Sequence, residues 1–215
     1  IKTVAIIGGG PSGCSVATLL KRKGFKVAVF HIEKRPEIIV GESLVPAIIP
    51  FLRQLGVEDE VKTYSTYKPG ASVWVSKDEE ATSPFSFGGG GLPPYAYNVP
   101  RTKFDQTIFD LAVREGVTFF THAAKLERVG NTDELRLSDD TIAAIGDFFN
   151  GQPDLIVDAS GRSRTISRLL DIPTKEGKRK DIALFAHLSG AEKIEPYNIH
   201  LHRLGKGWNW RIPLP

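Results

Sequence analysis

Apolar residues near the N-terminus change from short continuous runs to the spacing of one helix face. Residues 2–7 form an apolar run rich in β-branched side chains that ends at Gly8, which is typical of a buried parallel strand. Residues 11–23 carry apolar side chains at helical spacing, and residues 26–30 form a second apolar run. The order of strand, glycine-rich turn, helix and strand predicts a βαβ unit with a parallel sheet and a right-handed crossover.

Two more helices and a strand are predicted in the middle of the chain. The pattern at 46–55 predicts a short helix with Pro50 at its first position, and that at 102–115 predicts a longer amphipathic helix. Residues 71–75 match a strand. Residues 83–94 are rich in Ser, Gly and Pro, which predicts a loop that either shapes access to a site or only connects two elements.

Strands dominate the second half. Short strands are predicted near 117–121, 124–129 and 134–138, and residues 154–158 match a buried strand that rejoins the parallel sheet. Residues 182–212 alternate between apolar and polar positions, as an antiparallel sheet does. The predicted fold class is therefore α/β, with a Rossmann-like βαβ part and a parallel sheet interleaved with an antiparallel-sheet region.

Composition excludes several classes of protein. The 215 residues are 41% hydrophobic, which is too high for a disordered chain and enough for a substantial core. The formal net charge of +3 comes from both signs and argues against nucleic acid as the main partner. The single Cys excludes an internal disulfide framework, so we expect no metal cluster and a reducing, cytoplasmic compartment. No apolar run approaches the roughly 18 residues of a membrane span.

The first glycine-rich turn satisfies the pattern G-x-G-x-x-G directly after a strand and at the start of a helix. Gly8 permits the tight turn, Gly10 lets the backbone approach a pyrophosphate, and Gly13 lets the helix lie close to the sheet. Pro11 and Ser12 complete the turn at the helix N-terminus, where free N–H groups favour an anion. The turn predicts dinucleotide binding; the alternative is a turn that serves packing alone.

A ribose ligand is expected about 20 residues beyond this turn, at the end of the second strand. His31 takes the first position after that strand, and Glu33 follows two residues later. Glu33 is the better ligand by chemistry, because a carboxylate accepts hydrogen bonds from both hydroxyls, whereas His31 accepts with one nitrogen. Both residues are candidates, beside a plain surface role for either.

Three further segments carry a resemblance to known proteins. They are residues 40–46 (VGESLVP), 157–162 (VDASGR) and 207–213 (GWNWRIP). With the glycine turn they resemble the flavin-dependent halogenases, within the wider superfamily of FAD monooxygenases and geranylgeranyl reductases, over nearly the whole chain. The Trp-x-Trp-x-Ile-Pro segment is the most halogenase-specific of the three. The Gly-Glu-Ser-Leu-Val-Pro form is closest to halogenases that act on carrier-bound pyrrole or phenolic substrates.

The resemblance implies further cofactor-binding residues. Gly41, Glu42 and Ser43 would line the isoalloxazine ring of FAD and a halide site. Arg101 would lie near the flavin. Asp158 and Gly161 would pack against FAD as part of a second glycine-containing turn.

The resemblance also implies catalytic and substrate-facing residues. In these enzymes a flavin C4a-hydroperoxide oxidises chloride or bromide to hypohalous acid, and Lys68 looks like the lysine that they place between flavin and substrate. A partly desolvated amine holds that acid by a hydrogen bond or as a haloamine; the alternative is a surface lysine that begins a strand. Trp208 and Trp210 alternate on a strand and share one face. They would wall the flavin from the substrate, or else be two core aromatics.

The implied function is FADH2- and O2-dependent halogenation of an electron-rich aromatic substrate in secondary metabolism. The implied partners are a separate flavin reductase, because no NAD(P)H-binding segment is recognised, and a small aromatic substrate that is free or bound to a carrier protein. Three alternatives stay open: an aromatic hydroxylase that reduces its own flavin, a geranylgeranyl-type reductase, and a fragment that binds FAD without turnover.

The chain departs from the family pattern at two places. His31 stands where the family usually has Glu, and the family's later Gly-Asp segment should lie beyond Pro215. The chain also lacks Met, so we expect the complete protein to be longer, with the C-terminal part of the family fold absent here. The predicted domains are an FAD-binding domain at 1–70 with 100–170, and a sheet-rich substrate region at 71–99 with 171–215.

Overall fold

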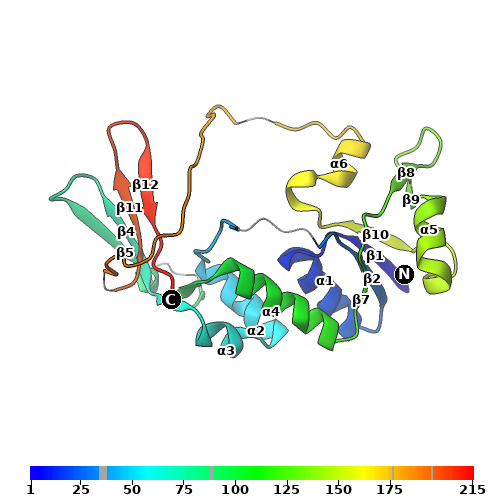
Figure 1. Ribbon diagram of the computed structural model, residues 1–215, viewed down its shortest axis with the longest axis horizontal. Helices are drawn as coiled ribbons and strands as arrows, with labels where there is room; N and C mark the ends of the chain where they lie inside the picture. The colour runs from blue at the N-terminus through cyan, green and yellow to red at the C-terminus, as the bar shows by residue number, and fades with distance from the viewer. Residues whose placement is uncertain (34–37, 88–89, 176, 195) are drawn as a thin grey trace. The chain divides into compact units, whose positions relative to one another are not determined.

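The chain folds into two compact units in a computed structural model (Figure 1). The first unit comprises Ile1–Pro36 with Ile108–Ala183, and the second comprises Glu37–Thr107 with Leu184–Pro215. The structure describes residues 1–33, 38–87, 90–175, 177–194 and 196–215.

A parallel four-stranded sheet forms the centre of the first unit (Figure 1). Its order is β10-β1-β2-β7, and every neighbouring pair is parallel. The predicted βαβ unit is confirmed, and so is the return of the late strand to the parallel sheet, where Ile7 pairs with Asp158. The elements are β1 (Thr3–Ile7), α1 (Pro11–Arg22), β2 (Lys26–Phe30), β7 (Thr118–Phe120) and β10 (Leu155–Asp158).

Both faces of this sheet are covered, which is why its central strands read as continuous apolar runs. Helix α1 packs on one face and buries Cys14 and Ala17. The other face packs against the pair β8 (Leu126–Arg128) and β9 (Leu135–Leu137) with α5 (Asp139–Ile145). The buried residues of that second core are Ala5, Ile7, Ala28, Phe30, Leu137, Ile145 and Phe149.

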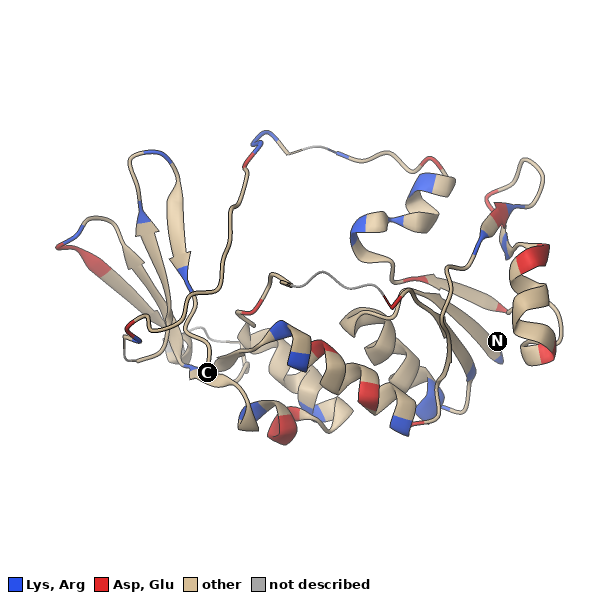
Figure 2. Cartoon of the chain, in the orientation of Figure 1, with Lys and Arg blue, Asp and Glu red and all other residues tan. Residues whose placement is uncertain are grey.

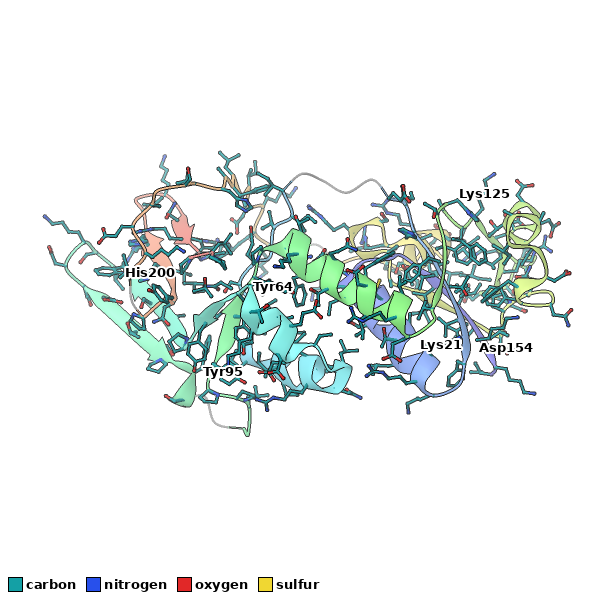
Figure 3. All side chains as sticks on the ribbon, turned by 60° about the horizontal axis from the view of Figure 1, so that its bottom comes forward. Lys21, Tyr64, Tyr95, Lys125, Asp154 and His200 are labelled. Carbon is teal, nitrogen blue, oxygen red and sulfur yellow. The ribbon has the colours of Figure 1, made fainter. Side chains whose placement is uncertain are left out.

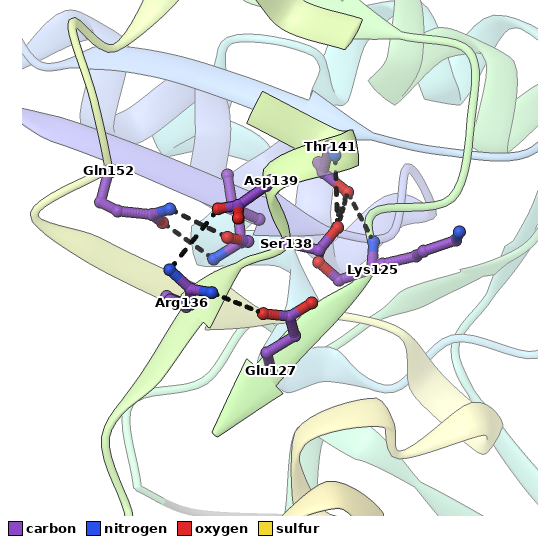
Figure 4. A network of polar contacts seen from close by, with 8 residues as sticks. Lys125, Glu127, Arg136, Ser138, Asp139, Thr141 and Gln152 are labelled. Carbon is purple, nitrogen blue, oxygen red and sulfur yellow. Dashed lines mark hydrogen bonds and ion pairs between the residues drawn. The ribbon is translucent and has the colours of Figure 1, made fainter. Parts of the chain in front are cut away.

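Polar contacts fix the covering layer and the start of β10. Ser138 caps α5 by accepting a hydrogen bond from the N–H of Thr141, and the Gln152 side chain bonds both backbone groups of Leu137 (Figure 4). At the edge labelled Asp154 in Figure 3, that carboxylate accepts from the N–H groups of Lys2 and Thr3 at 2.6 and 2.9 Å. The amino ends of β1 and β10 are thereby joined, so their carboxyl ends stand together at the opposite edge.

The second unit contains a mixed four-stranded sheet with the order β12-β11-β4-β5 and a separate two-stranded sheet of β3 and β6. Strand β11 pairs parallel with β4, and the β11–β12 and β4–β5 pairs are antiparallel. The strands are β3 (Thr66–Lys68), β4 (Gly70–Trp74), β5 (Glu80–Pro84), β6 (Ala96–Asn98), β11 (Ile199–Arg203) and β12 (Trp208–Arg211).

The remaining helices are short, apart from α4, along which two basic residues are followed by two acidic residues and a final arginine (Figure 2). Helix α2 ends at Gly56, whose φ of +79° is left-handed, and Pro50 stands at its second position rather than its first because Ile48 is the N-cap. The helices are α2 (Ile49–Leu55), α3 (Glu58–Thr63), α4 (Arg101–Arg114) and α6 (Thr165–Leu169), with short 3-10 turns at Pro46–Ile48, Phe85–Phe87, Gly146–Phe148 and Gly161–Ser163.

Two sequence-based predictions were wrong in part. The loop predicted at 83–94 begins with the end of β5 and a 3-10 turn, and residues 88–89 lie outside the described part of the chain. The sheet predicted over 182–212 forms only from Ile199 onward, and the described residues between 182 and 198 form no strand. Alternation alone did not make a strand there, because Ile182 and Leu184 are 91% and 96% exposed and have no sheet face to bury.

The described residues contain neither a membrane-spanning helix nor a cluster of metal-binding side chains. None of their helices is long and apolar enough to cross a membrane. Among the same residues, no group of three or more His, Cys, Asp or Glu side chains is arranged to hold a metal ion.

Candidate functional site

The turn between β1 and α1 has no room for side chains at two of its glycines. A Cβ on Gly13 would lie 1.9 Å from the carbonyl oxygen of Gly8, and a Cβ on Gly8 would lie 2.4 Å from that of Ala159. A Cβ on Gly10 would meet nothing within 4 Å. The turn is therefore packed tightly against the end of β10 and open at its middle glycine, as a pyrophosphate cradle requires.

The N-terminus of α1 is free to bind an anion. Gly10 is the N-cap and provides no side-chain cap, Pro11 follows it, and the first turn contains no acidic residue. Helix geometry leaves the N–H groups of Ser12 and Gly13 without acceptors inside the helix. Together with the positive end of the helix dipole, these groups fit the pyrophosphate of FAD.

The structure brings His31, rather than Glu33, against the glycine turn. A Cβ on Gly9 would lie 2.6 Å from the Cβ of His31. The imidazole packs beside Phe109 and Phe119, with ring centroids 5.5 and 5.6 Å away. Glu33 is exposed two residues later. The ribose contact stays a prediction for both residues.

The segment after β10 lies beside the same turn, because the N–H of Ala159 donates to the carbonyl of Ile7 at 2.9 Å. The Asp158 carboxylate accepts from the N–H groups of Ser160 and Ile166 at 2.9 and 2.8 Å. Burial would raise the pKa of Asp158, but these hydrogen bonds outweigh it and lower the pKa. Asp158 therefore shapes the turn that contains Gly161, whose φ is +61°.

In the second unit, residues 42–44 run antiparallel beside β6. The N–H of Leu44 donates to Tyr97 at 2.9 Å, and the N–H of Val99 donates to Glu42 at 2.7 Å. Ser43 forms an antiparallel bridge with Asn98. The Gly-Glu-Ser segment is therefore fixed to the edge of β6 opposite β3.

Arg101 holds the start of this segment. Its Nη1 donates to the carbonyl of Val40 at 2.7 Å, and its other donors form a two-point ion pair with Asp105 at 2.9 and 3.1 Å. A Cβ on Gly41, whose φ is +110°, would lie 2.6 Å from Nη1 of Arg101. Only glycine fits this position beside the guanidinium. The sequence reasoning missed Asp105, although its spacing of four residues from Arg101 on a helix is a signal for such a pair.

Glu42 is a buried carboxylate with two hydrogen bonds. Oε2 accepts from the N–H of Gly41 at 2.8 Å, and Oε1 lies 3.1 Å from Nε2 of His187. Burial would raise the pKa of Glu42, but the hydrogen bonds from His187 and the backbone outweigh it and lower the pKa. The sequence reasoning missed His187, and no local pattern links it to a residue so far away in the chain.

Lys68 is a buried amine, so the alternative of a surface lysine does not hold, although Lys68 does end the short strand β3. The residue is 2% exposed. Its Nζ donates to Oγ of Ser43 at 2.7 Å and to the carbonyl of Leu44, and lies 5.2 Å from the ring centroid of Phe85. Burial lowers its pKa to about 8. The structure thus brings Lys68 together with the motif that contains Glu42 and Ser43.

Trp208 and Trp210 lie on β12, the edge strand of the four-stranded sheet. They share one face, as the alternation predicted, and their rings are 6.1 Å apart. Their exposures of 44% and 56% show that they are not core residues of the described chain. The predicted residues therefore lie at three places. The glycine turn lies beside the end of β10 in the first unit. In the second unit, Lys68 of β3 lies against Ser43 and Leu44, and the tryptophan pair lies on β12.

The tryptophan halogenase family model matches residues 3–93 and 91–215. The chain belongs to the tryptophan halogenase family. Among its relatives, the flavin-dependent halogenase armH3 of Armillaria mellea is 30% identical over 223 residues, covering 98% of this chain and 44% of the relative. The 1H-pyrrole-2-carbonyl-[peptidyl-carrier protein] chlorinase of Pseudomonas fluorescens is 27% identical and covers 98% of this chain and 53% of its own.

The fold of the halogenase family is confirmed by a solved structure. The myxobacterial chondrochloren halogenase CndH, an FAD-dependent halogenase, superposes with a TM-score of 0.71 at 24% identity, covering 100% of this chain and 51% of its own. The chain spans about half the length of the relatives that it matches. Its α/β class, with a parallel sheet and separate antiparallel strand pairs, is the one expected from the sequence. The four-stranded sheet of the second unit is mixed rather than antiparallel, because β11 runs parallel to β4.

Proposed function

We propose that the chain is part of an FAD-dependent halogenase that places chlorine or bromine on an electron-rich aromatic ring. Family membership supports flavin-dependent halogenation. The observation that carries the chemistry is the burial of Lys68 against the Gly-Glu-Ser segment, with a pKa lowered to about 8. A solvated lysine would be protonated and mobile, whereas this amine is fixed and partly neutral at neutral pH.

The open glycine turn supports FAD as the cofactor, because its free N–H groups and missing side chains fit a pyrophosphate. When bound, reduced FAD would supply the oxygen chemistry by which halide is oxidised to hypohalous acid. We assign pyrophosphate binding to the turn from Gly8 to Gly13. The predicted domain bounds, with 1–70 and 100–170 binding FAD, belong to the same proposal.

The other residues are assigned to the adenosine and isoalloxazine ends of FAD. Some of these residues would pack in the turn, others would contact the ribose, and others would face the flavin. The assigned residues are Pro11, Ser12, His31, Glu33, Gly41, Glu42, Ser43, Arg101, Asp158 and Gly161.

The amine of Lys68 is suited to hold hypohalous acid. A pKa of about 8 leaves about a tenth of the amine neutral at pH 7, against about one part in three thousand for an ordinary lysine. Ser43 and Leu44 accept hydrogen bonds from Nζ, so the two N–H groups of a neutral amine are satisfied. The lone pair of Lys68 is then left for the electrophilic halogen.

Trp208 and Trp210 present their indole rings on an exposed face of β12. We assign them to the wall between flavin and substrate. There, two flat apolar rings would exclude water and prevent the flavin from transferring oxygen directly to the substrate. Because these rings are not buried in a core, they are available for that role.

Substrate and partners follow from the same proposal. One relative is named for a pyrrole substrate on a carrier protein, so we propose a pyrrole or phenol, free or carrier-bound. We also propose that a separate reductase supplies the reduced flavin and that the protein works in the cytoplasm. Chloride and bromide are both candidate halides.

A halogenation assay of the complete protein tests this function. The protein is supplied with FAD, a flavin reductase, NADH, oxygen and either halide, with a carrier-bound pyrrole or a phenol, and products are identified by mass spectrometry. We expect halogenated product from the wild type and at least a hundredfold less from Lys68→Met. Oxygenated product without halogen, formed with NADPH and no reductase, would instead identify a hydroxylase.

A further inference from the structure

Asn98 is a buried side chain with an unused hydrogen-bond acceptor. The residue is 0% exposed at the end of β6. Its Nδ2 donates to the carbonyl of Tyr197 at 3.5 Å, and its Oδ1 has no partner among the described residues. A buried acceptor without a donor is costly and rare, so it points to a donor from a ligand or water.

The strand register places this acceptor beside the amine of Lys68. In the β3–β6 pair, Lys68 is opposite Ala96 and Thr66 is opposite Asn98. Residues opposite one another, and alternate residues of one strand, share a face, so Lys68 and Asn98 lie on the same face. Ser43 faces Asn98 across the other edge of β6. To reach Ser43 at 2.7 Å, the Lys68 side chain must cross β6 over Ala96 and beside Asn98.

The two side chains offer complementary groups to a small molecule. The N–H groups of a neutral Lys68 amine are taken by Ser43 and Leu44, which leaves its lone pair. Asn98 offers a carbonyl oxygen without a donor. A ligand that fits both has one hydrogen-bond donor for Oδ1 of Asn98 and a second end, electrophilic or protic, for the lone pair of Lys68. Hypohalous acid, the oxidant of the proposed function, has these two ends and no other polar group.

We propose that Asn98 is a binding residue for hypohalous acid. Its Oδ1 accepts the O–H of the acid, and this hydrogen bond turns the halogen toward the lone pair of Lys68. No bond is made or broken in this step. The role is orientation and retention, so the oxidant is held on the enzyme rather than released. The inference rests on the proposed function, and the competing occupant of the site is an ordered water.

A single-turnover experiment without aromatic substrate tests retention. The complete protein, loaded with photoreduced FAD, is mixed with oxygen and chloride and desalted within seconds. Oxidising equivalents on the protein are measured with iodide, and released oxidant is measured with a diketone trap. In Asn98→Leu, which removes the acceptor at similar volume, we expect about three- to tenfold less retained oxidant, the effect of one hydrogen bond, and correspondingly more in the trap.

Asn198→Leu is the matched control. Asn198 is also buried, at 1% exposed, and its Oδ1 also lacks a partner, but its Nδ2 donates to Ser72 on the other sheet. Retention in this control should equal that of the wild type. Should Asn98→Leu fail to fold, Asn98→Ala removes the same acceptor without added bulk.

A second readout separates binding from structure. The pKa of Lys68, followed by NMR of its ε-carbon, should stay near 8 in the Asn98 variants. A shift of this pKa toward 10.5 would mean that the amine has lost its burial, and the inference would be wrong. Equal retention in wild type and Asn98→Leu would assign the acceptor to water. A wild type that oxidises no halide would overturn the proposed function and this inference together.

Discussion

Nε2 of His187 lies 3.1 Å from Oε1 of Glu42, although 145 residues separate the two in sequence. The glutamate is 7% exposed, whereas the side chain of the histidine is 54% exposed. His187 therefore covers a buried carboxylate and ties the chain before β11 to the Gly-Glu-Ser segment.

Replacing His187 with Ala should raise the pKa of Glu42. Burial opposes ionisation of this carboxyl, and the variant keeps only backbone donors to offset it. Because the folded-state pKa of Glu42 is lowered, its ionisation stabilises the fold above the unfolded pKa, and this contribution is lost as pH falls through the folded value. Carboxyl NMR titration checks the shift. His187→Gln, which keeps a donor, should shift it less, and an unchanged pKa in His187→Ala would show that the contact is not formed in solution.

Burial of the Lys68 amine should make the free energy of unfolding rise with pH. Its folded pKa of about 8 lies below the ordinary 10.5, so the unfolded chain binds more protons between these values. Relative to Lys68→Met, the free energy of unfolding of the wild type should rise by about 3 kcal/mol across this window. Urea unfolding at a series of pH values measures it. Lys62→Met, at an exposed position of α3, is the control that should keep the slope; parallel curves for wild type and Lys68→Met would refute the buried amine.

Two substitutions in the glycine turn should have different effects, one on folding and the other on FAD binding. Gly13→Ala puts a Cβ 1.9 Å from a backbone oxygen, so the free energy of unfolding should fall by at least about 2 kcal/mol. Gly10→Ala meets no atom within 4 Å, so it should cost no more than about 1 kcal/mol, as a change of N-cap does. It should nevertheless weaken FAD binding of the complete protein at least tenfold, because its methyl group enters the phosphate space. Fluorescence titration with FAD decides, and unchanged affinity in a folded Gly10→Ala would place the pyrophosphate elsewhere.

Arg101 and Asp105 should behave as a coupled pair. Their side chains are only 19% and 8% exposed, and Arg101→Met leaves the Asp105 carboxylate buried without its partner. We expect this change to destabilise the fold by about 3 kcal/mol. The double variant with Asp105→Leu should recover most of that loss, since no lone charge stays buried. Thermal unfolding of the four proteins gives the coupling, and additive losses would show that the ion pair contributes nothing of its own.

Much of the first unit was predictable because its signals are local. The apolar runs at Thr3–Ile7 and Lys26–Phe30 and the turn at Gly8 depend on neighbours in sequence, and each determines its own element. The predicted strand near 154–158 was confirmed as β10, which pairs parallel with β1. Its predicted burial was wrong, because β10 lies at the edge of the sheet and Leu155 is 39% exposed. Helices α3 and α5 were missed because each is short and has a weak apolar pattern.

The sequence by itself determined the fold class, the glycine turn, the family and the identity of Lys68 as a candidate. Only the tertiary structure decided that this lysine is buried beside Ser43 and Leu44, that His187 covers Glu42, and that Asn98 keeps a free acceptor. The physical reason is that periodicity describes which residues face the same way along one element. Burial, a shifted pKa and an unpaired acceptor depend on what other elements bring to that face, and those elements are far away in the chain.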